Sequence, residues 1–232
     1  QTHTQSERDR QREKLDSNEE EAGEALCKIY AAEGKAGLMM ALCEDAAAAS
    51  PPAGWALSRK GKLLLGVGRV DEAVTSFQQA LRMSPDNSEC WGALGRAYEA
   101  GGRLEPSILA YQRSLELMPP SSSKDDVAFR ADCQLRIAKT QARMGLVKNA
   151  VAALEALHSR YPTWAVGAAA LGDALYSRAL EATGDGTYTA AHAAADRAHM
   201  LYTGVAKAHP TLPGAWKRVG DALTLRFATH TH

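Results

Sequence analysis

The chain has 232 residues, of which 45% are hydrophobic but only 6% aromatic, and alanine is abundant. This mixture favours closely packed helices over a β-sandwich, which needs aromatic and β-branched side chains. Lys+Arg and Asp+Glu number 27 each, so the chain lacks the overall positive field of a dedicated nucleic-acid binder. The four cysteines form no C-x-x-C pair, which favours a reducing compartment over a disulfide scaffold.

Residues 1–18 are rich in charged side chains, which predicts a poorly ordered N-terminal segment. They contain no apolar core, so they do not form a secretory signal. No apolar run reaches membrane-spanning length, because the longest candidate, WAVGAAALGDALY, is broken by Asp173. The chain ends in ATHTH without a helix stop, and we expect it to be part of a longer protein.

The main signal is an internal repeat. Prolines and glycines recur in matching phase at an interval of 34 residues: Pro51, Pro85 and Pro119; Gly34, Gly68 and Gly102. Small and bulky residues recur in the same register: Gly61 with Gly95, Ala73 with Ser107, Phe77 with Tyr111, Ala80 with Ser114, Leu81 with Leu115. This period and this pattern resemble the tetratricopeptide repeat (TPR), in which each unit is a pair of antiparallel helices.

The stretch 91–119 shows why these residues are needed. Trp91, Leu94 and Tyr98 share one face of a first helix. Gly95 lets the partner helix approach closely, and Gly102 can end the helix in the left-handed conformation. In the second helix, the positions expected to face back on the first are Ser107, Tyr111, Ser114 and Leu115. Each pair leaves an apolar face that the next pair covers.

The predicted fold is therefore all-α, a TPR solenoid of about five helix pairs plus one helix over residues 19–228. We expect repeats at about 20–52, 54–86, 88–120, 125–163 and 165–211, and a final helix at 212–228. Nine extra residues enter around PSSSKDD, and fourteen enter the unit that starts with ALGDALY. That unit, counted here as the fourth pair, is predicted to have elongated helices.

The order of these units resembles an internal stretch of the large TPR subunit of the superkiller (Ski) complex. The resemblance rests on W-A-L-x-x-K-G from Trp55, on DEAVTSFQQALRMSPDNSECWGALGRAYEAGG, on the lengthened unit after Gly172, and on W-K-R-V-G-D-A from Trp216. It implies a non-enzymatic cytoplasmic scaffold, with a nuclear pool also allowed. It also implies protein partners, a DExH-type RNA helicase and WD40-repeat subunits, in exosome-mediated 3′-to-5′ decay of messenger RNA. RNA contact is at most indirect, and no membrane or small-molecule substrate is implied.

First helices of TPR stacks line a concave groove, and four cations fall at equivalent groove positions: Lys28, Lys62, Arg96 and Lys139. Asp173 and Asp221 occupy the same position in the last two units. A ladder of cations would favour an acidic peptide or a phosphate backbone, and the alternative function is an unrelated TPR adaptor that binds an acidic peptide or a partner helix in this groove. The alternative, a solvated face on which lysine and arginine are common, stays open. Capture of a chaperone's terminal carboxylate is not favoured, because Ser58 and Gly92 replace the asparagines that such a clamp uses.

Other candidate sites are weak. His192, Asp196 and His199 share one helical face, but a surface or interface role is favoured over a metal site because no further strong ligand accompanies them. Trp91, Trp216, Tyr98 and Tyr111 are predicted to pack rather than to stack on a ligand. We predict no catalytic residue, no cofactor and no metal. An enzyme whose catalytic domain lies outside this chain stays an open alternative.

Overall fold

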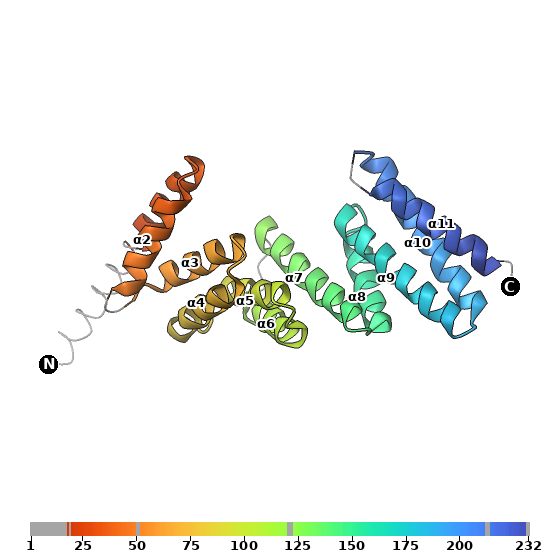
Figure 1. Cartoon of the computed structure of the whole chain (residues 1–232), viewed down its shortest axis with the longest axis horizontal. Coiled ribbons are helices and arrows are strands. Elements are labelled where there is room, and N and C mark those ends of the chain that lie inside the picture. Colours follow the sequence, from red (N-terminus) through yellow and green to blue (C-terminus); the bar gives the residue numbers. More distant parts are fainter. Residues whose placement is uncertain (1–17, 19, 50–51, 120–122, 212–213, 231–232) are drawn as a thin grey trace. The chain divides into compact units, whose positions relative to one another are not determined.

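The computed structural model describes residues 18, 20–49, 52–119, 123–211 and 214–230, and all of its regular elements are helices (Figure 1). The predictions for the N-terminal segment and for Pro51 fall outside these ranges. The chain divides into two compact units, Gln1–Leu117 and Met118–His232. None of the described helices combines the length and the apolar character needed to cross a membrane.

The N-terminal unit is a succession of short helices. A first helix covers residues 20–32, and it is followed by α2 (Ala36–Ala48), α3 (Gly54–Gly66), α4 (Val70–Met83), α5 (Ser88–Ala100) and α6 (Leu104–Leu117). Neighbours in sequence pack on each other, α3 with α4, α4 with α5 and α5 with α6. The all-α fold of consecutive helix pairs is therefore confirmed, whereas the exact repeat boundaries stay a prediction.

Three glycines that were expected to end helices in this unit, Gly34, Gly68 and Gly102, have φ angles of 69°, 81° and 71°. These angles lie in the left-handed region that side chains with a Cβ atom disfavour. At Gly102 the turn closes with backbone hydrogen bonds from Gly102 N to Glu99 O and from Arg103 N to Tyr98 O. The 34-residue glycine period is thus a period of helix-ending turns.

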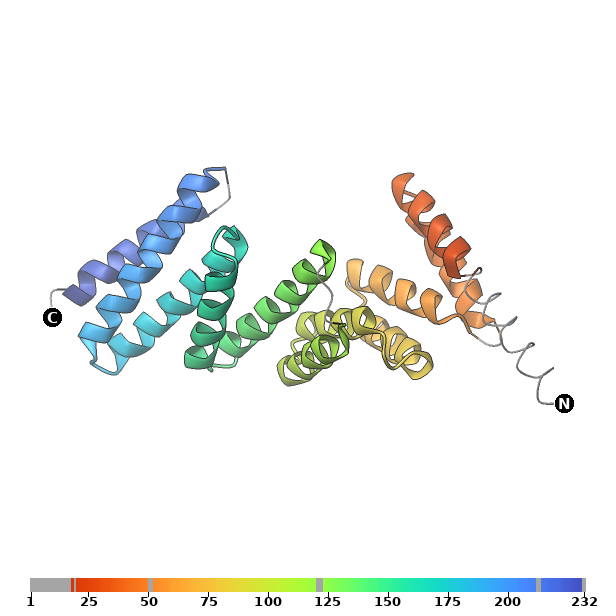
Figure 2. The same cartoon turned by 180° about the vertical axis from the view of Figure 1, so that it is seen from behind.

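The C-terminal unit has longer helices: α7 (Lys124–Arg143), α8 (Val147–Arg160), α9 (Ala165–Gly184), α10 (Tyr188–Ala208) and α11 (Ala215–His230). The elongated pair is α9 with α10, which have 20 and 21 residues where α5 and α6 have 13 and 14. Each helix thus gains about two turns, which returns its apolar stripe to the same face. Counted from the helix at 20–32 this pair is the fifth, and Figures 1 and 2 show its two helices side by side.

Most of the nine residues inserted around PSSSKDD lengthen α7, which has 20 residues where α5 has 13. Ser123 caps it, because its hydroxyl accepts a hydrogen bond from the backbone N–H of Asp126 at 3.1 Å. Side chains from all five helices of this unit, α7 to α11, form its core. The most buried of them include Leu154, Leu171 and Leu175.

Candidate protein-binding surfaces

The four predicted groove cations are all exposed side chains on first helices of pairs. Lys28, Lys62 and Arg96 belong to the N-terminal unit, on the helix at 20–32, on α3 and on α5, respectively. Lys139 lies on α7 of the C-terminal unit. The ladder therefore consists of three cations in the N-terminal unit and one in the C-terminal unit.

Ion pairs neutralise part of this charge. Lys62 Nζ lies 3.5 Å from Glu89 Oε2, a contact between exposed side chains that contributes about 0–1 kcal/mol. Among the described residues Arg96 forms no ion pair, so its guanidinium is free for a partner. The acidic side chain Glu99 is engaged elsewhere, since it accepts a hydrogen bond from the hydroxyl of Tyr111 at 2.9 Å.

Lys139 borders a hollow of about 510 Å³ between first helices of the C-terminal unit. Asp173 of α9 and Arg218 of α11 border it too, and Arg218 Nε lies 3.4 Å from Asp173 Oδ1. The hydroxyl of Tyr202 donates a hydrogen bond to the same Asp173 oxygen at 2.8 Å. Burial of the phenol, reinforced by the Asp173 carboxylate, raises the pKa of Tyr202, so this hydrogen is retained at physiological pH. The hollow thus presents two cations and one carboxylate.

We expect Tyr202→Phe to lower the free energy of unfolding by about 1–2 kcal/mol, because Asp173 loses a charge-assisted hydrogen bond. Urea denaturation followed by circular dichroism measures the change. Tyr176→Phe is the matched control, since Tyr176 lies on α9 and makes no hydrogen bond with a described residue. Equal effects of the two substitutions would contradict the assignment.

The histidine face of α10 holds α11 in place. His192 Nδ1 lies 3.1 Å from the backbone oxygen of Arg226, and His199 Nδ1 lies 3.4 Å from the backbone oxygen of Val219. Asp196 forms an ion pair with the Arg226 guanidinium at 3.2 Å. These contacts place the three side chains at the interface of α10 with α11, and among the described residues no three metal-ligating side chains form a cluster.

The four cysteines are buried thiols that form no disulfide within the described part of the chain: Cys27, Cys43, Cys90 and Cys133. Burial raises the pKa of Cys43 to about 12, and the neighbouring Cys27 adds to this effect. Burial also raises the pKa of Cys90. All four behave as small apolar core residues, as the sequence predicts for Cys90.

We expect these thiols to react with a disulfide reagent at least about 100-fold more slowly in the folded chain than in urea, at both pH 7 and pH 9. The unfolded Cys43 thiol loses its proton near pH 8.5 and the folded one near pH 12. Its contribution to stability is therefore complete below about pH 8.5 and is lost as the pH rises toward 12. Ser159→Cys, at an exposed position, is the control that should react quickly. Equally fast reaction of the native thiols would contradict their burial.

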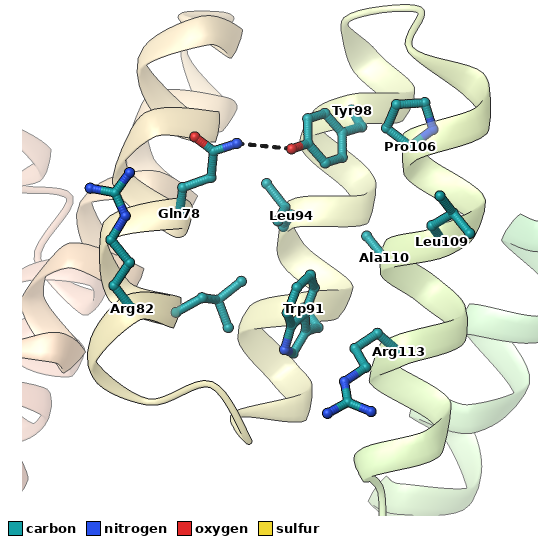
Figure 3. A pocket seen from close by; sticks show the side chains of 10 residues that line it. Gln78, Arg82, Trp91, Leu94, Tyr98, Pro106, Leu109, Ala110 and Arg113 are labelled. Atoms are coloured by element: carbon teal, nitrogen blue, oxygen red, sulfur yellow. Dashed lines mark hydrogen bonds between the residues drawn. The ribbon is translucent and has the colours of Figure 1, made fainter.

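A second hollow lies where the sequence predicted only packing. It measures about 640 Å³, and α5 forms its floor while α4 and α6 form its walls (Figure 3). Tyr111 is fully buried as predicted, but Trp91 and Tyr98 are only half-buried and line this hollow. Leu109 lies at the edge of the hollow and is 66% exposed. It is not one of the positions of α6 that face α5. An apolar residue out of phase with those positions is the sequence signal that could have located the hollow.

Trp216 also departs from its predicted packing role, since it is 54% exposed. It lies on α11, which packs on α10 and α9. No described helix follows α11, so nothing in the described part of the chain covers the face that carries Trp216.

Comparison with known proteins agrees with the fold. Residues 58–122 and 132–163 each match the tetratricopeptide repeat. A thermophilic TPR protein of Thermus thermophilus has a TM-score of 0.58 at 19% identity, covering 88% of this chain and 99% of that one. A structure of MamA has a TM-score of 0.61 at 19% identity, covering 81% and 94% of the two chains. YrrB, described as a TPR protein with an unusual peptide-binding site, has a TM-score of 0.59 at 17% identity, covering 82% and 87%.

Two segments of the chain thus match the tetratricopeptide repeat, and the fold of the chain resembles that of solved TPR structures. Two curated proteins are similar to this chain in amino-acid sequence. Tetratricopeptide repeat protein 37 of Xenopus laevis is 27% identical over 220 residues, which are 94% of this chain and 14% of that protein. Superkiller complex protein 3 of Mus musculus is 34% identical over 88 residues, which are 36% of this chain and 6% of that protein. The chain thus spans a small part of the length of the curated relatives it matches, and the similarity is distant.

Proposed function

We propose that this chain is a non-enzymatic scaffold segment of a superkiller-type complex. The observation that carries the proposal is the 34% identity with superkiller complex protein 3 over 88 residues, and the similarity to tetratricopeptide repeat protein 37 over 94% of this chain supports a common origin of the whole segment. The order of the units supports it as well, since the elongated pair α9 and α10 follows ordinary pairs and precedes the W-K-R-V-G-D-A helix α11. Catalysis is assigned to other subunits.

In this function the chain holds partners rather than transforming a substrate. By resemblance the partners are a DExH-type RNA helicase and WD40-repeat subunits, and the assembly feeds messenger RNA to the exosome in the cytoplasm. Balanced charge supports contact with proteins rather than with RNA, since the chain carries 27 basic and 27 acidic side chains.

Affinity purification of the tagged full-length gene product from cytoplasm tests this proposal. We expect an RNA helicase and a WD40-repeat protein to co-purify in stoichiometric amounts, also after nuclease treatment. A tagged TPR protein of unrelated function, expressed at the same level, is the control. Recovery of neither partner would contradict the superkiller assignment while leaving the TPR fold untouched.

A second candidate function is an adaptor that binds an acidic peptide along the first helices. The observation that favours it is the exposure of Lys28, Lys62 and Arg96 in the N-terminal unit, with Arg96 unpaired among the described residues. We expect Lys62→Glu with Arg96→Glu to abolish capture of an acidic partner, because two cations become anions. Fluorescence anisotropy with a labelled poly-glutamate peptide measures the loss, and unchanged binding would contradict this candidate.

A further inference from the structure

We propose that the hollow over α5, between α4 and α6, is a second binding site, which takes an acidic amphipathic peptide segment of a partner protein. The walls of this site are the second helices of two consecutive pairs and its floor is α5, but neither Lys62 nor Arg96 of the predicted cation ladder lines it. The inference does not depend on which complex contains the chain.

The floor of the hollow is apolar, and hydrogen bonds within the chain fix the positions of its aromatic rings. Trp91, Leu94 and Tyr98 lie along one side of α5, three and four residues apart, and Figure 3 shows all three between the walls. Two hydrogen bonds hold the aromatic rings: Trp91 Nε1 donates to the backbone oxygen of Pro85 at 2.8 Å, and Gln78 Nε2 donates to the Tyr98 hydroxyl at 3.0 Å. The rings are therefore fixed before a ligand arrives, which reduces the entropy cost of binding.

The walls leave room for large side chains. On α6, Pro106 and Ala110 are compact, and Leu109 is the exposed apolar residue at the edge. A volume of about 640 Å³ falls within the range of ligand-binding pockets. Seven residues of α5 span about 10 Å, so the floor accommodates two apolar side chains one helical turn apart.

Charge complementarity selects an acidic ligand. Figure 3 shows Arg82 of α4 and Arg113 of α6 on opposite walls, with the Arg82 guanidinium at the level of Gln78 and the Arg113 guanidinium at the Trp91 end of the hollow. Arg82 forms no ion pair among the described residues. Arg113 contacts Glu116 at 3.0 Å within α6, in an exposed pair that a ligand carboxylate can replace at little cost. Two guanidinium groups flanking an apolar floor suit carboxylates placed next to apolar anchors.

The C-terminal unit has a hollow at the equivalent place, between two second helices, and its lining differs in charge. It measures about 500 Å³ and is lined from α8, α9 and α10 by residues such as His158, Ala168, Met200 and Val205. Among the residues that the structure describes, no lysine or arginine lines it. The apolar character thus recurs between second helices, while the pair of guanidinium groups does not.

Fluorescence anisotropy on the whole chain tests the site with a labelled 12-residue peptide that has two leucines four residues apart, followed by two glutamates. We expect saturable binding that weakens at least about tenfold in Arg82→Glu with Arg113→Glu, because both charge contacts become repulsive. A peptide with lysines in place of the glutamates should show the reverse preference. Leu109→Glu should weaken both peptides, because it places a charge against the apolar anchors.

Lys62→Glu with Arg96→Glu is the matched control, since it reverses the same amount of charge on the first helices. It should leave binding of the leucine–glutamate peptide within about twofold. Equal binding by wild type and Arg82→Glu with Arg113→Glu would overturn the proposal, and so would an equally large loss in the control variant. No binding at millimolar concentration would overturn it too. All replaced side chains are exposed, and circular dichroism checks that each variant is folded.

Discussion

Gly95→Ala is expected to destabilise the chain by about 1–3 kcal/mol, although alanine is the better helix former. A Cβ atom on Gly95 would lie 2.7 Å from two carbon atoms of the Tyr111 ring. That ring is fully buried, and its hydroxyl donates to Glu99, so it has no free space into which to move. The cost of overpacking should therefore exceed the gain in helix propensity. Urea denaturation and the melting temperature measure it.

Gly66→Ala is the matched control, because a Cβ atom there meets nothing within 4 Å and the residue also lies in a helix. It should leave stability within about 0.5 kcal/mol or raise it slightly. Combining Gly95→Ala with Tyr111→Leu should cost less than the two single changes added together, because the smaller side chain leaves room for the methyl group. If Gly95→Ala is as stable as the wild type, α5 and α6 do not pack in the way described.

The same contact explains why the fold could be predicted from the sequence. Gly61 faces Phe77 as Gly95 faces Tyr111, and Gly172 faces Tyr202, each across the interface of one helix pair. A small residue opposite an aromatic one at a constant spacing is a local feature, and repetition makes it visible. The two turns added to α9 and α10 were predictable too, because insertions of equal length in both helices of a pair keep the apolar stripes in phase.

The surfaces could be predicted less well, because they depend on residues that only packing brings together. Arg82 and Arg113 come from different repeats, and each alone looks like an ordinary solvated side chain. The contact of His192 with the backbone of Arg226 depends on how α11 docks on α10. The cation ladder could be predicted because its residues recur with the repeat period. The ion pair of Lys62 with Glu89 could not, because it joins two different helices.

Leu175→Ala should have the largest effect in the C-terminal unit, a loss of about 2–5 kcal/mol. Leu175 is fully buried on α9, in the core cluster that includes Leu154 and Tyr202. Removing its side chain leaves a cavity that close-packed helices fill only in part, so lost dispersion contacts add to the lost burial of apolar surface.

Leu180→Ala tests whether this effect comes from burial rather than from the change of residue type. It makes the same substitution on the same helix, but Leu180 is 48% exposed. We expect it to cost less than about 1 kcal/mol, since alanine is the better helix former and the lost side chain is partly in water. The α9–α10 pair carries two extra turns, and a scaffold keeps such a pair rigid only if its interior is packed along the added length. Similar losses at both positions in urea denaturation would show that the buried face of α9 has been misassigned.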